Sequence, residues 1–315
     1  MPGGAVRLAL VGAGPWGRNY IRTIAALDDV ELVAVASRSP ATAAHVPAGC
    51  RIVTDWRTLL QDPAVEGVII ASPPDTHADI LIAAVDHQKA VLVEKPVVMS
   101  RSDAARIRAA LEGRRTTILV GHTHLFQPSF RALCREAASL GPVRLIRSSA
   151  GRYGAYRPDV PVLWDWAPHD LAMCLTLMPG PVRVEGVRRE TSMIDNVPAE
   201  RIVLDLALGP VPANIVISTL DPRHRWFAAE FDTCTLVFRD FVAEQLVRIP
   251  AGEDIDGNSG VPIRTDAELP LTRAVLDFAR IVSTRDTDRR GIDLGLSVVD
   301  LIADAEDMLS QPSRP

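Results

Sequence analysis

Two short stretches of the sequence carry side chains that could bind or transfer a proton. The first is VLVEKPVV at residues 91–98, where Lys95 lies between Glu94 and Pro96 at the end of an apolar run. The chain has 34 basic residues, yet only two of them are lysines, Lys89 and Lys95. Lysine is a compact cation whose pKa changes readily on burial, whereas arginine stays protonated. Lys95 is therefore a candidate for proton chemistry.

The second stretch is LWDWAPHDLAMCL at residues 163–175. Proline is tolerated in the first turn of a helix, so Pro168 predicts a helix that begins near Trp166. Residues four apart share a helix face, so Asp165 could hold the imidazole of His169 in one tautomer. Histidine titrates near neutral pH and suits a base that takes the proton of an alcohol. The alternative is structural, with Asp165 as a helix cap and His169 on the surface or in the core.

A glycine-rich turn near the start of the chain indicates a bound cofactor for that proton chemistry. Residues 12–17 read GAGPWG, with G-x-G-x-x-G spacing after an apolar run and before a helical pattern. Gly12 would permit the tight turn, Gly14 would let the backbone approach a pyrophosphate, and Gly17 would allow close helix–strand packing. Helix N-terminal N–H groups favour phosphates. This turn, with Pro15 and Trp16, is predicted to bind a dinucleotide; a turn without a ligand is the alternative.

The end of the next apolar run bears on which dinucleotide binds. An NAD site usually has Asp or Glu about 20 residues past the glycines, for the ribose 2′-hydroxyl. Here ELVAVA at 31–36 is followed by Ser37 and Arg38. A guanidinium binds phosphate through charge and paired hydrogen bonds, so NADP is favoured and NAD is the alternative. Arg38 could also stack on the adenine of either cofactor.

The elements that position these residues alternate along the first 120 residues. Short apolar runs predict buried parallel strands at 6–11, 31–36, 51–53, 67–71, 90–93 and 116–120. Helical patterns lie between them at 16–27, 41–46, 56–61, 76–88 and 101–112. This alternation predicts an α/β Rossmann domain, a doubly wound parallel sheet, over residues 1–121.

Ligands of such sheets bind beyond the carboxyl ends of the strands. The glycine turn, Lys95 and the loop SPPDTH at 72–77 all follow predicted strands. Ser72, Pro73 and His77 of that loop are therefore candidates for cofactor contacts. A purely structural hydrogen bond is an equal alternative for His77.

After residue 121 the predicted strands and helices no longer alternate. Helices are predicted at 127–139, 166–178, 270–284 and 292–309, and strands at 182–190, 199–208, 212–219, 225–231, 234–239 and 243–249. Short turns such as Leu208-Gly209-Pro210 indicate hairpins, so residues 122–315 are predicted to form an α+β substrate-binding domain with an open, mainly antiparallel sheet. The exposed face of such a sheet needs cover, so we expect a homodimer or homotetramer through it.

Composition limits the classes of function. The net charge is −5 with a pI of about 5.8, and no long basic cluster indicates nucleic-acid binding. The four cysteines are far apart and form no Cys-x-x-Cys, so we expect neither a disulfide framework nor a zinc site. The sequence shows no signal-peptide layout and no apolar run of membrane-spanning length. We expect a cytoplasmic protein that binds no metal, nucleic acid or membrane.

Taken together, the motifs resemble those of the Gfo/Idh/MocA family, which includes glucose–fructose oxidoreductase and inositol dehydrogenase. GAGPWG, SPPDTH, VLVEKP, VGHTHLFQP at 120–128 and the Asp-x-x-x-His of LWDWAPHD follow the family's order and approximate spacing. The resemblance implies NAD(P)-dependent oxidation or reduction of a sugar or polyol. It implies Lys95 and His169 as the catalytic pair, with Asp165 assisting. Glu94 and Lys95 are also predicted to contact the cofactor.

The chain departs from many family members around Asp165, because Trp166-Ala167-Pro168 stands where a glycine is common. This form resembles a subgroup of sugar-nucleotide 3-dehydrogenases of the UDP-amino-sugar type, whose members often use NAD, in conflict with Ser37-Arg38. An inositol-type dehydrogenase and a non-catalytic NAD(P)-binding sensor or scaffold are the alternatives. Candidate substrate contacts are His122, His124, Arg152, Tyr153 and Trp164, with Tyr156 and Arg157 nearby.

Overall fold

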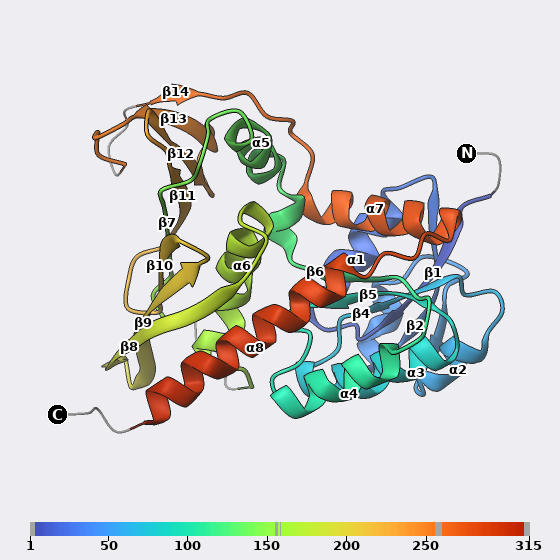
Figure 1. The fold of residues 1–315 in the computed structure, drawn as a ribbon. Helices are drawn as coiled ribbons and strands as arrows, with labels where there is room; N and C mark the ends of the chain where they lie inside the picture. Colours follow the sequence, from blue (N-terminus) through green and yellow to red (C-terminus); the bar gives the residue numbers. More distant parts are fainter. Residues whose placement is uncertain (1–3, 155–156, 158, 256–259, 312–315) are drawn as a thin grey trace. The chain divides into compact units, whose positions relative to one another are not determined.

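The computed structural model describes residues 4–154, 157, 159–255 and 260–311 (Figure 1). The chain divides into two compact units. The first contains residues 1–123 and 269–299, and the second contains residues 124–268 and 300–315. The sequence-based division at residue 121 has a single boundary, whereas a late segment of the chain returns to the first unit.

The first unit contains the predicted doubly wound sheet. Its six strands are all parallel, in the order β3-β2-β1-β4-β5-β6. The strands are β1 (Val6–Val11), β2 (Val30–Ala36), β3 (Arg51–Val53), β4 (Gly67–Ile70), β5 (Ala90–Glu94) and β6 (Ile118–Gly121). The helices are α1 (Pro15–Ala25), α2 (Arg57–Gln61), α3 (His77–Asp86) and α4 (Arg101–Leu111). The helix predicted at 41–46 is a 3-10 helix, η1 (Pro40–Ala44).

Two C-terminal helices explain why the late segment joins this unit. They are α7 (Pro270–Thr284) and α8 (Arg290–Ser310), of which α8 continues into the second unit. Val275 and Phe278 of α7 are fully buried in one apolar cluster with Leu8 of β1 and Tyr20 of α1. The α7 helix therefore supplies part of the core beneath the glycine turn.

The second unit contains the predicted open sheet, with eight strands in the order β14-β13-β12-β11-β7-β10-β9-β8. All pairs are antiparallel except β7 with β10. The strands are β7 (Leu145–Gly151), β8 (Val182–Ile194), β9 (Val197–Leu208), β10 (Val211–Ser218), β11 (His224–Glu230), β12 (Cys234–Arg239), β13 (Leu246–Pro250) and β14 (Val261–Pro262). The sequence did not predict β7, although it lies in the middle of the sheet.

The β8–β9 hairpin is longer than the two strands predicted for it. Its turn is formed by Asp195 and Asn196, whose φ angles are both positive, at 49° and 63°. Asp and Asn tolerate this left-handed conformation better than other non-glycine residues. The strands can therefore continue to the turn itself.

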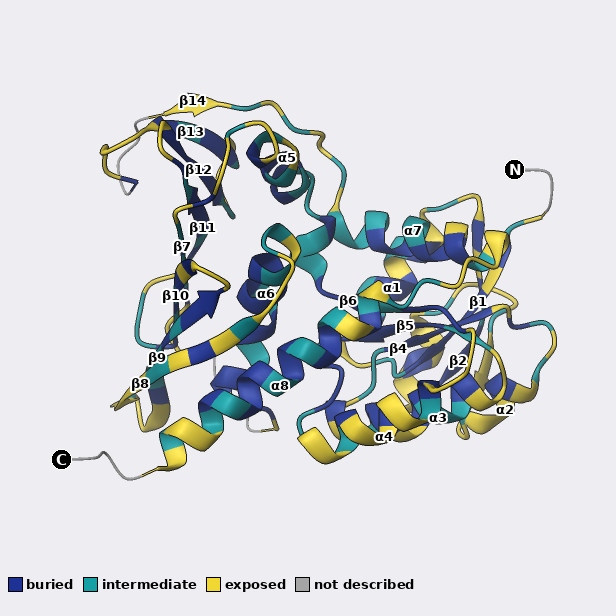
Figure 2. Cartoon of the chain, viewed as in Figure 1, coloured by how far each residue is buried: buried dark blue, intermediate teal, exposed yellow. Residues whose placement is uncertain are grey.

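Two helices, α5 (Pro128–Ala137) and α6 (Val162–Leu177), complete the second unit. The prediction that α6 begins near Trp166 is wrong, because its N-cap is Pro161 and Asp165 N–H already donates to Pro161 O at 2.9 Å. Pro168 lies inside the helix, and Asp165 is not its cap. Figure 2 shows that most of α6 is buried, and its packing on β9 and β10 outweighs the lost N–H bond.

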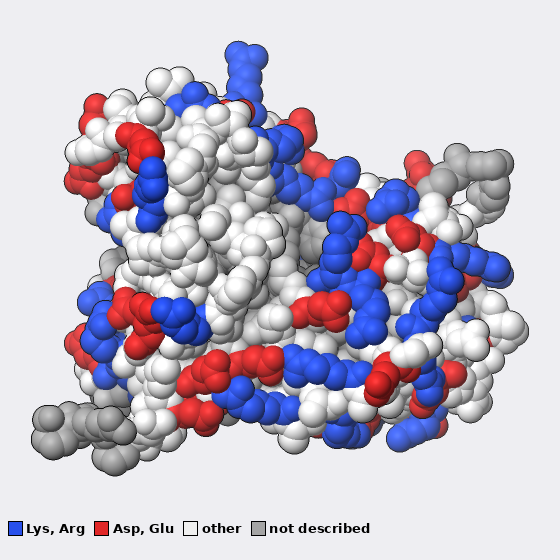
Figure 3. Space-filling view, in the orientation of Figure 1, with Lys and Arg blue, Asp and Glu red and all other residues white. Residues whose placement is uncertain are grey.

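Charged side chains of both signs alternate over the face shown in Figure 3. Many form exposed ion pairs, such as Arg106 with Asp79 and Arg144 with Asp232. No helix in the described part of the chain is long and apolar enough to cross a bilayer. Within the same residues, no three His, Cys, Asp or Glu side chains gather in a way that could hold a metal ion.

Candidate active site

The carboxyl ends of neighbouring strands in the first sheet lie level with one another. Val11, the last residue of β1, pairs with Ala36 of β2 and with Ile70 of β4. Ile70 in turn pairs with Val93 of β5. The residues that follow these strand ends therefore line a single edge of the sheet. They are Gly12, Ser37, Arg38, Ser72, Pro73 and Lys95, and Glu94 is itself the last residue of β5.

The glycine turn fits a dinucleotide. Gly12 has φ +96°, and a Cβ there would lie 2.7 Å from Ala71 O. A Cβ at Gly17 would lie 2.1 Å from Gly12 O, so the fold itself requires both glycines. At Gly14 a Cβ would meet no described atom within 4 Å, and Pro15 and Trp16 beside it are exposed. Open space therefore lies where the N-terminus of α1 would receive a pyrophosphate.

The β2 end presents a cation to solvent. The Ser37 hydroxyl oxygen accepts hydrogen bonds from Ser39 N–H at 3.2 Å and from the Thr42 hydroxyl at 2.7 Å. These bonds hold the short loop between β2 and η1. The Arg38 side chain in that loop is exposed.

Glu94, before the candidate lysine, lies in the protein interior with only 6% of its surface exposed. The Tyr20 hydroxyl donates to its Oε1 at 2.5 Å, and Lys95 N–H donates to its Oε2 at 3.2 Å. Burial raises the pKa of Glu94, although hydrogen bonds from Tyr20 and Trp16 oppose that rise. Glu94 therefore joins α1, which follows the glycine turn, to the backbone at Lys95.

This bond predicts an effect on stability. Tyr20→Phe leaves one oxygen of a buried carboxylate without its donor, so the free energy of unfolding should fall by about 1–3 kcal/mol. Urea unfolding measures the change. Tyr153→Phe is the matched control, because that ring is 58% exposed and its loss of a hydroxyl should change stability by less than about 0.5 kcal/mol. Equal stability of both variants would mean that the Tyr20–Glu94 bond contributes nothing.

His77 is buried, with 1% of its surface exposed. Its Nδ1 lies 3.0 Å from Pro96 O, and its Nε2 lies 2.9 Å from Ser72 O. Burial lowers the pKa of His77, against the effect of these carbonyl contacts. The imidazole therefore connects the loop after β4 with the loop that carries Lys95. These contacts match the structural role that was the alternative to a cofactor contact for His77.

In the second unit, two histidine rings meet. His169 of α6 and His124 of η3 (Thr123–Phe126) have ring centroids 4.5 Å apart, with an interplanar angle of 70°. The Nε2 atom of His124 lies 3.6 Å from Oδ2 of Asp240, which follows β12. Phe238 packs edge-on against His124 with centroids 6.3 Å apart. The candidate base thus lies beside a second histidine and its carboxylate.

A buried ion pair lies next to His169 in the chain. Arg225 of β11 donates from Nη1 to Oδ2 of Asp170 at 2.8 Å, and the two side chains are 7% and 0% exposed. The Arg225 guanidinium also lies 6.0 Å from the centroid of the Trp166 ring. Sequence reasoning missed Asp170, Arg225 and Asp240. Of these three residues, only Asp170 could have been suspected from the sequence, because it directly follows His169.

Asp165, the predicted partner of His169, has a cationic contact of its own. Its Oδ1 lies 3.4 Å from Nη1 of Arg157, which also donates to Asp159 at 2.6 Å. Asp165 is partly buried, with 17% of its side chain exposed. The contact joins Arg157 to the first turn of α6.

The remaining substrate candidates lie in different surroundings. Trp164 is 2% exposed and packs in the core of the second unit. His122 is 2% exposed and follows β6 in the first unit. Arg152 and Tyr153 are exposed just after β7. Tyr156 lies outside the described residues.

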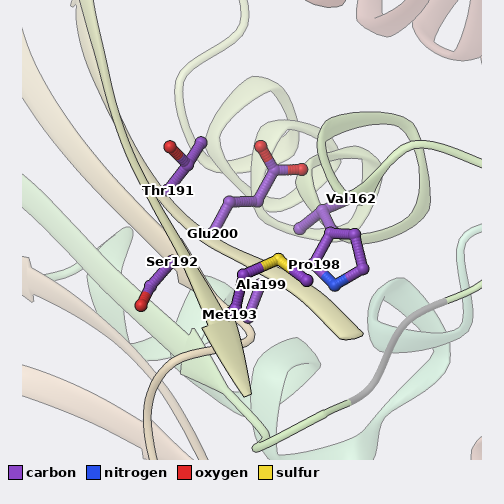
Figure 4. A pocket seen from close by; sticks show the side chains of 7 residues that line it. All are labelled: Val162, Thr191, Ser192, Met193, Pro198, Ala199 and Glu200. Carbon is purple, nitrogen blue, oxygen red and sulfur yellow. The ribbon is translucent and has the colours of Figure 1, made fainter. Parts of the chain in front are cut away.

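A cavity of about 360 Å³ in the second unit escaped prediction (Figure 4). It lies between the start of α6 and the β8–β9 hairpin. Among its described lining residues Glu200 carries the carboxylate, and burial raises the pKa of that group against the effect of Arg189. The lining residues are Val162, Thr191, Ser192, Met193, Pro198, Ala199 and Glu200.

Comparisons with known proteins agree with the fold of the chain. A model of the oxidoreductase family with the NAD-binding Rossmann fold, GFO_IDH_MocA, matches residues 6–122. A crystal structure of a Magnetospirillum magnetotacticum MS-1 protein described as an oxidoreductase is 39% identical, with a TM-score of 0.88. That match covers 96% of this chain and 99% of the other. The chain therefore belongs to the Gfo/Idh/MocA oxidoreductase family.

The curated relatives match a smaller part of this chain. Inositol 2-dehydrogenase of Rhizobium meliloti (strain 1021) is 32% identical over 149 residues, which are 45% of this chain and 44% of that protein. The dTDP-3,4-didehydro-2,6-dideoxy-alpha-D-glucose 3-reductase of Saccharopolyspora spinosa is 33% identical over 153 residues, which are 47% and 46% of the two chains. The matched region thus spans about half the length of these curated relatives.

Proposed function

We propose that the protein transfers hydride between a nicotinamide dinucleotide and a hydroxyl-bearing carbon of a sugar or sugar nucleotide. The observation that carries this proposal is the common edge formed by the ends of β1, β4 and β5. The ends of these strands lie level with one another. Open space at Gly14 lies shortly after β1, and the partly exposed Lys95 comes directly after β5. The similarity to a dTDP-sugar 3-reductase supports a sugar-nucleotide substrate.

The chain's own residues have separate tasks in this proposal. The dinucleotide, when bound, supplies the hydride acceptor or donor. The N–H groups at the start of α1 bind its pyrophosphate. His169 takes the hydroxyl proton during oxidation and returns it during reduction. Lys95 donates a hydrogen bond to the reacting oxygen and stabilises its negative charge.

An inositol-type polyol dehydrogenase is the second candidate, and the similarity to inositol 2-dehydrogenase favours it. The two substrates differ in the nucleoside diphosphate that only a sugar nucleotide carries. Native mass spectrometry with NADP, NAD, nucleotide sugars and cyclitols separates them. Binding of a nucleotide sugar together with a dinucleotide supports the first proposal, and binding of cyclitols alone supports the second. A protein that binds no dinucleotide would refute both.

We further propose NADP as the preferred cofactor, with Arg38 bound to its 2′-phosphate. Arg38→Ala should then raise the dissociation constant of NADP about 10–100-fold, the usual effect of losing a hydrogen bond to a charged group. NAD has no 2′-phosphate and serves as the internal control. Calorimetric titration of both cofactors measures the difference. Equal weakening of NADP and NAD would mean that Arg38 stacks on the adenine.

A further inference from the structure

The amino ends of the strands in the first unit border a cavity that the proposed function does not use. Its volume is about 610 Å³, within the range of about 300–1,000 Å³ that is usual for small-molecule sites. Arg7 near the start of β1 and Ala90 at the start of β5 line it. Gly12 and Lys95 follow the other ends of the same two strands. The cavity therefore lies at the opposite edge of the sheet from the proposed cofactor site.

Lys89, the second of the two lysines in the chain, fixes part of the cavity wall. Its Nζ donates to Asp62 O at 2.8 Å and to Val65 O at 2.6 Å, which joins the loop before β5 to the loop before β4. An ammonium carries three N–H donors, so one remains after these two bonds. The Asp62 carboxylate, which attracts Lys89, is already paired with Arg51. Lys89 therefore brings to the cavity one remaining donor and a charge that shares its nearby carboxylate with Arg51.

Two arginines reach the cavity from segments that are joined to each other. Arg115 lies before β6 and Arg285 directly follows α7, and both line the cavity with exposed side chains. The Thr117 hydroxyl donates to Asp286 O, which ties the segment before β6 to the segment after α7. Among the described residues, neither guanidinium has a hydrogen bond or an ion pair. Both groups therefore keep their donors for a ligand.

Positive charge exceeds negative charge in this cavity. Its described lining contains four lysine or arginine side chains and two carboxylates, namely Arg7, Lys89, Arg115, Arg285, Glu66 and Asp286. Glu66 already accepts from Arg7 N–H at 2.9 Å and lies 3.5 Å from Arg7 Nε. Asp286 interacts with Arg290, which is not among the lining residues. Lys89, Arg115 and Arg285 therefore remain for a ligand, although the whole chain has a net charge of −5.

We propose that this cavity is a second anion site, which binds the phosphate group of a small molecule. A phosphate monoester carries a charge of about −1.5 to −2 at pH 7 and three acceptor oxygens. Guanidinium groups form paired hydrogen bonds with such oxygens, and an ammonium binds them as a point charge. A carboxylate has a single charge and two oxygens, so it would leave one of the three cations unmatched. The volume of the cavity leaves room for the rest of the ligand beside its phosphate.

Calorimetric titration of the full-length protein with inorganic pyrophosphate, at fixed ionic strength, tests this inference. The unaltered protein should bind pyrophosphate with a dissociation constant below about 1 mM. Arg115→Ala and Arg285→Asn should each raise that constant about tenfold or more, because each removes one hydrogen-bonding cation. Asparagine is chosen at position 285 since it tolerates the left-handed backbone there, where φ is 51°. Pyrophosphate bound at the glycine turn would keep its affinity in both variants.

Arg114→Ala is the matched control. Arg114 precedes Arg115 in the chain and is also exposed, but it is paired with Asp86 at 2.7 Å and is not among the lining residues. Its loss should change the dissociation constant less than about twofold. Thermal unfolding without pyrophosphate should be the same for the three variants and the unaltered protein, because the side chains removed are exposed.

The inference would be overturned if pyrophosphate did not bind, or if it bound the unaltered protein and both cavity variants equally well. An equal loss of affinity in Arg114→Ala would also overturn it, because general attraction to surface charge would then explain the binding. Titration with NADP keeps this test apart from the proposed function. A protein that binds NADP but no pyrophosphate would refute the cavity site alone, and the reverse result would refute only the proposed function.

Discussion

His169→Ala is expected to lower the turnover number by about 10²–10⁴, the usual contribution of a general acid or base. The imidazole is the group proposed to hold the hydroxyl proton, and alanine supplies no replacement. The dissociation constant of NADP should stay unchanged, because the proposed cofactor residues belong to the first unit. Steady-state kinetics and cofactor titration on the same preparation measure both quantities.

His87→Ala is the matched control for this prediction. That imidazole is exposed and contacts only Ala83 O of its own helix among the hydrogen bonds of the described residues. Turnover of the control should equal that of the unaltered protein. Full activity in His169→Ala would remove the base from the proposal. A matching loss of NADP binding would indicate a folding defect instead.

The largest effect on stability is expected for Arg225→Ala, which should lower the free energy of unfolding by about 3–5 kcal/mol. Asp170 is fully buried, and its Oδ2 accepts from Arg225 at 2.8 Å. Without the guanidinium, a carboxylate would remain in the interior with its charge uncompensated. Urea unfolding followed by circular dichroism measures the loss.

Two further variants separate the buried charge from other effects. Arg183→Ala removes an exposed arginine, paired with exposed Glu185, and should cost less than about 1 kcal/mol. The double variant Arg225→Met with Asp170→Leu removes both buried charges and should recover most of the stability. A double variant as unstable as Arg225→Ala would show that packing of the arginine stem, and not the charge, accounts for the loss.

The fold of the first unit could be predicted from sequence because each of its strands is a short, apolar run bounded by turn residues. All six predicted strands are confirmed within three residues at each end. The strand β7 could not be predicted in this way, since LIRSSAG alternates buried and partly exposed positions and contains Arg147 and two serines. Its place between β11 and β10 depends on tertiary pairing.

The candidate residues of the first unit could be predicted from local sequence, whereas the surroundings of His169 in the second unit could not. The candidate residues of the first unit lie in short motifs at or soon after the end of a strand, so one motif at a time could reveal them. The residues that meet around His124 are His169, Asp170, Arg225 and Asp240, which no local pattern connects. The start of α6 was predicted too late because proline is usually found in the first turn of a helix. In this helix Pro168 lies in the interior, where burial of the surrounding residues stabilises the helix.

The return of α7 to the first unit also bears on the order in which the protein is made. Domains generally fold as units, N-terminal first, while the ribosome is still adding residues. Here the apolar cluster that contains Leu8 and Tyr20 also needs Val275 and Phe278, which are synthesised more than 250 residues after Leu8. The nascent chain must therefore carry an incomplete nucleotide-binding core throughout synthesis of the second sheet, and that core closes only after residues 270–284 leave the ribosome.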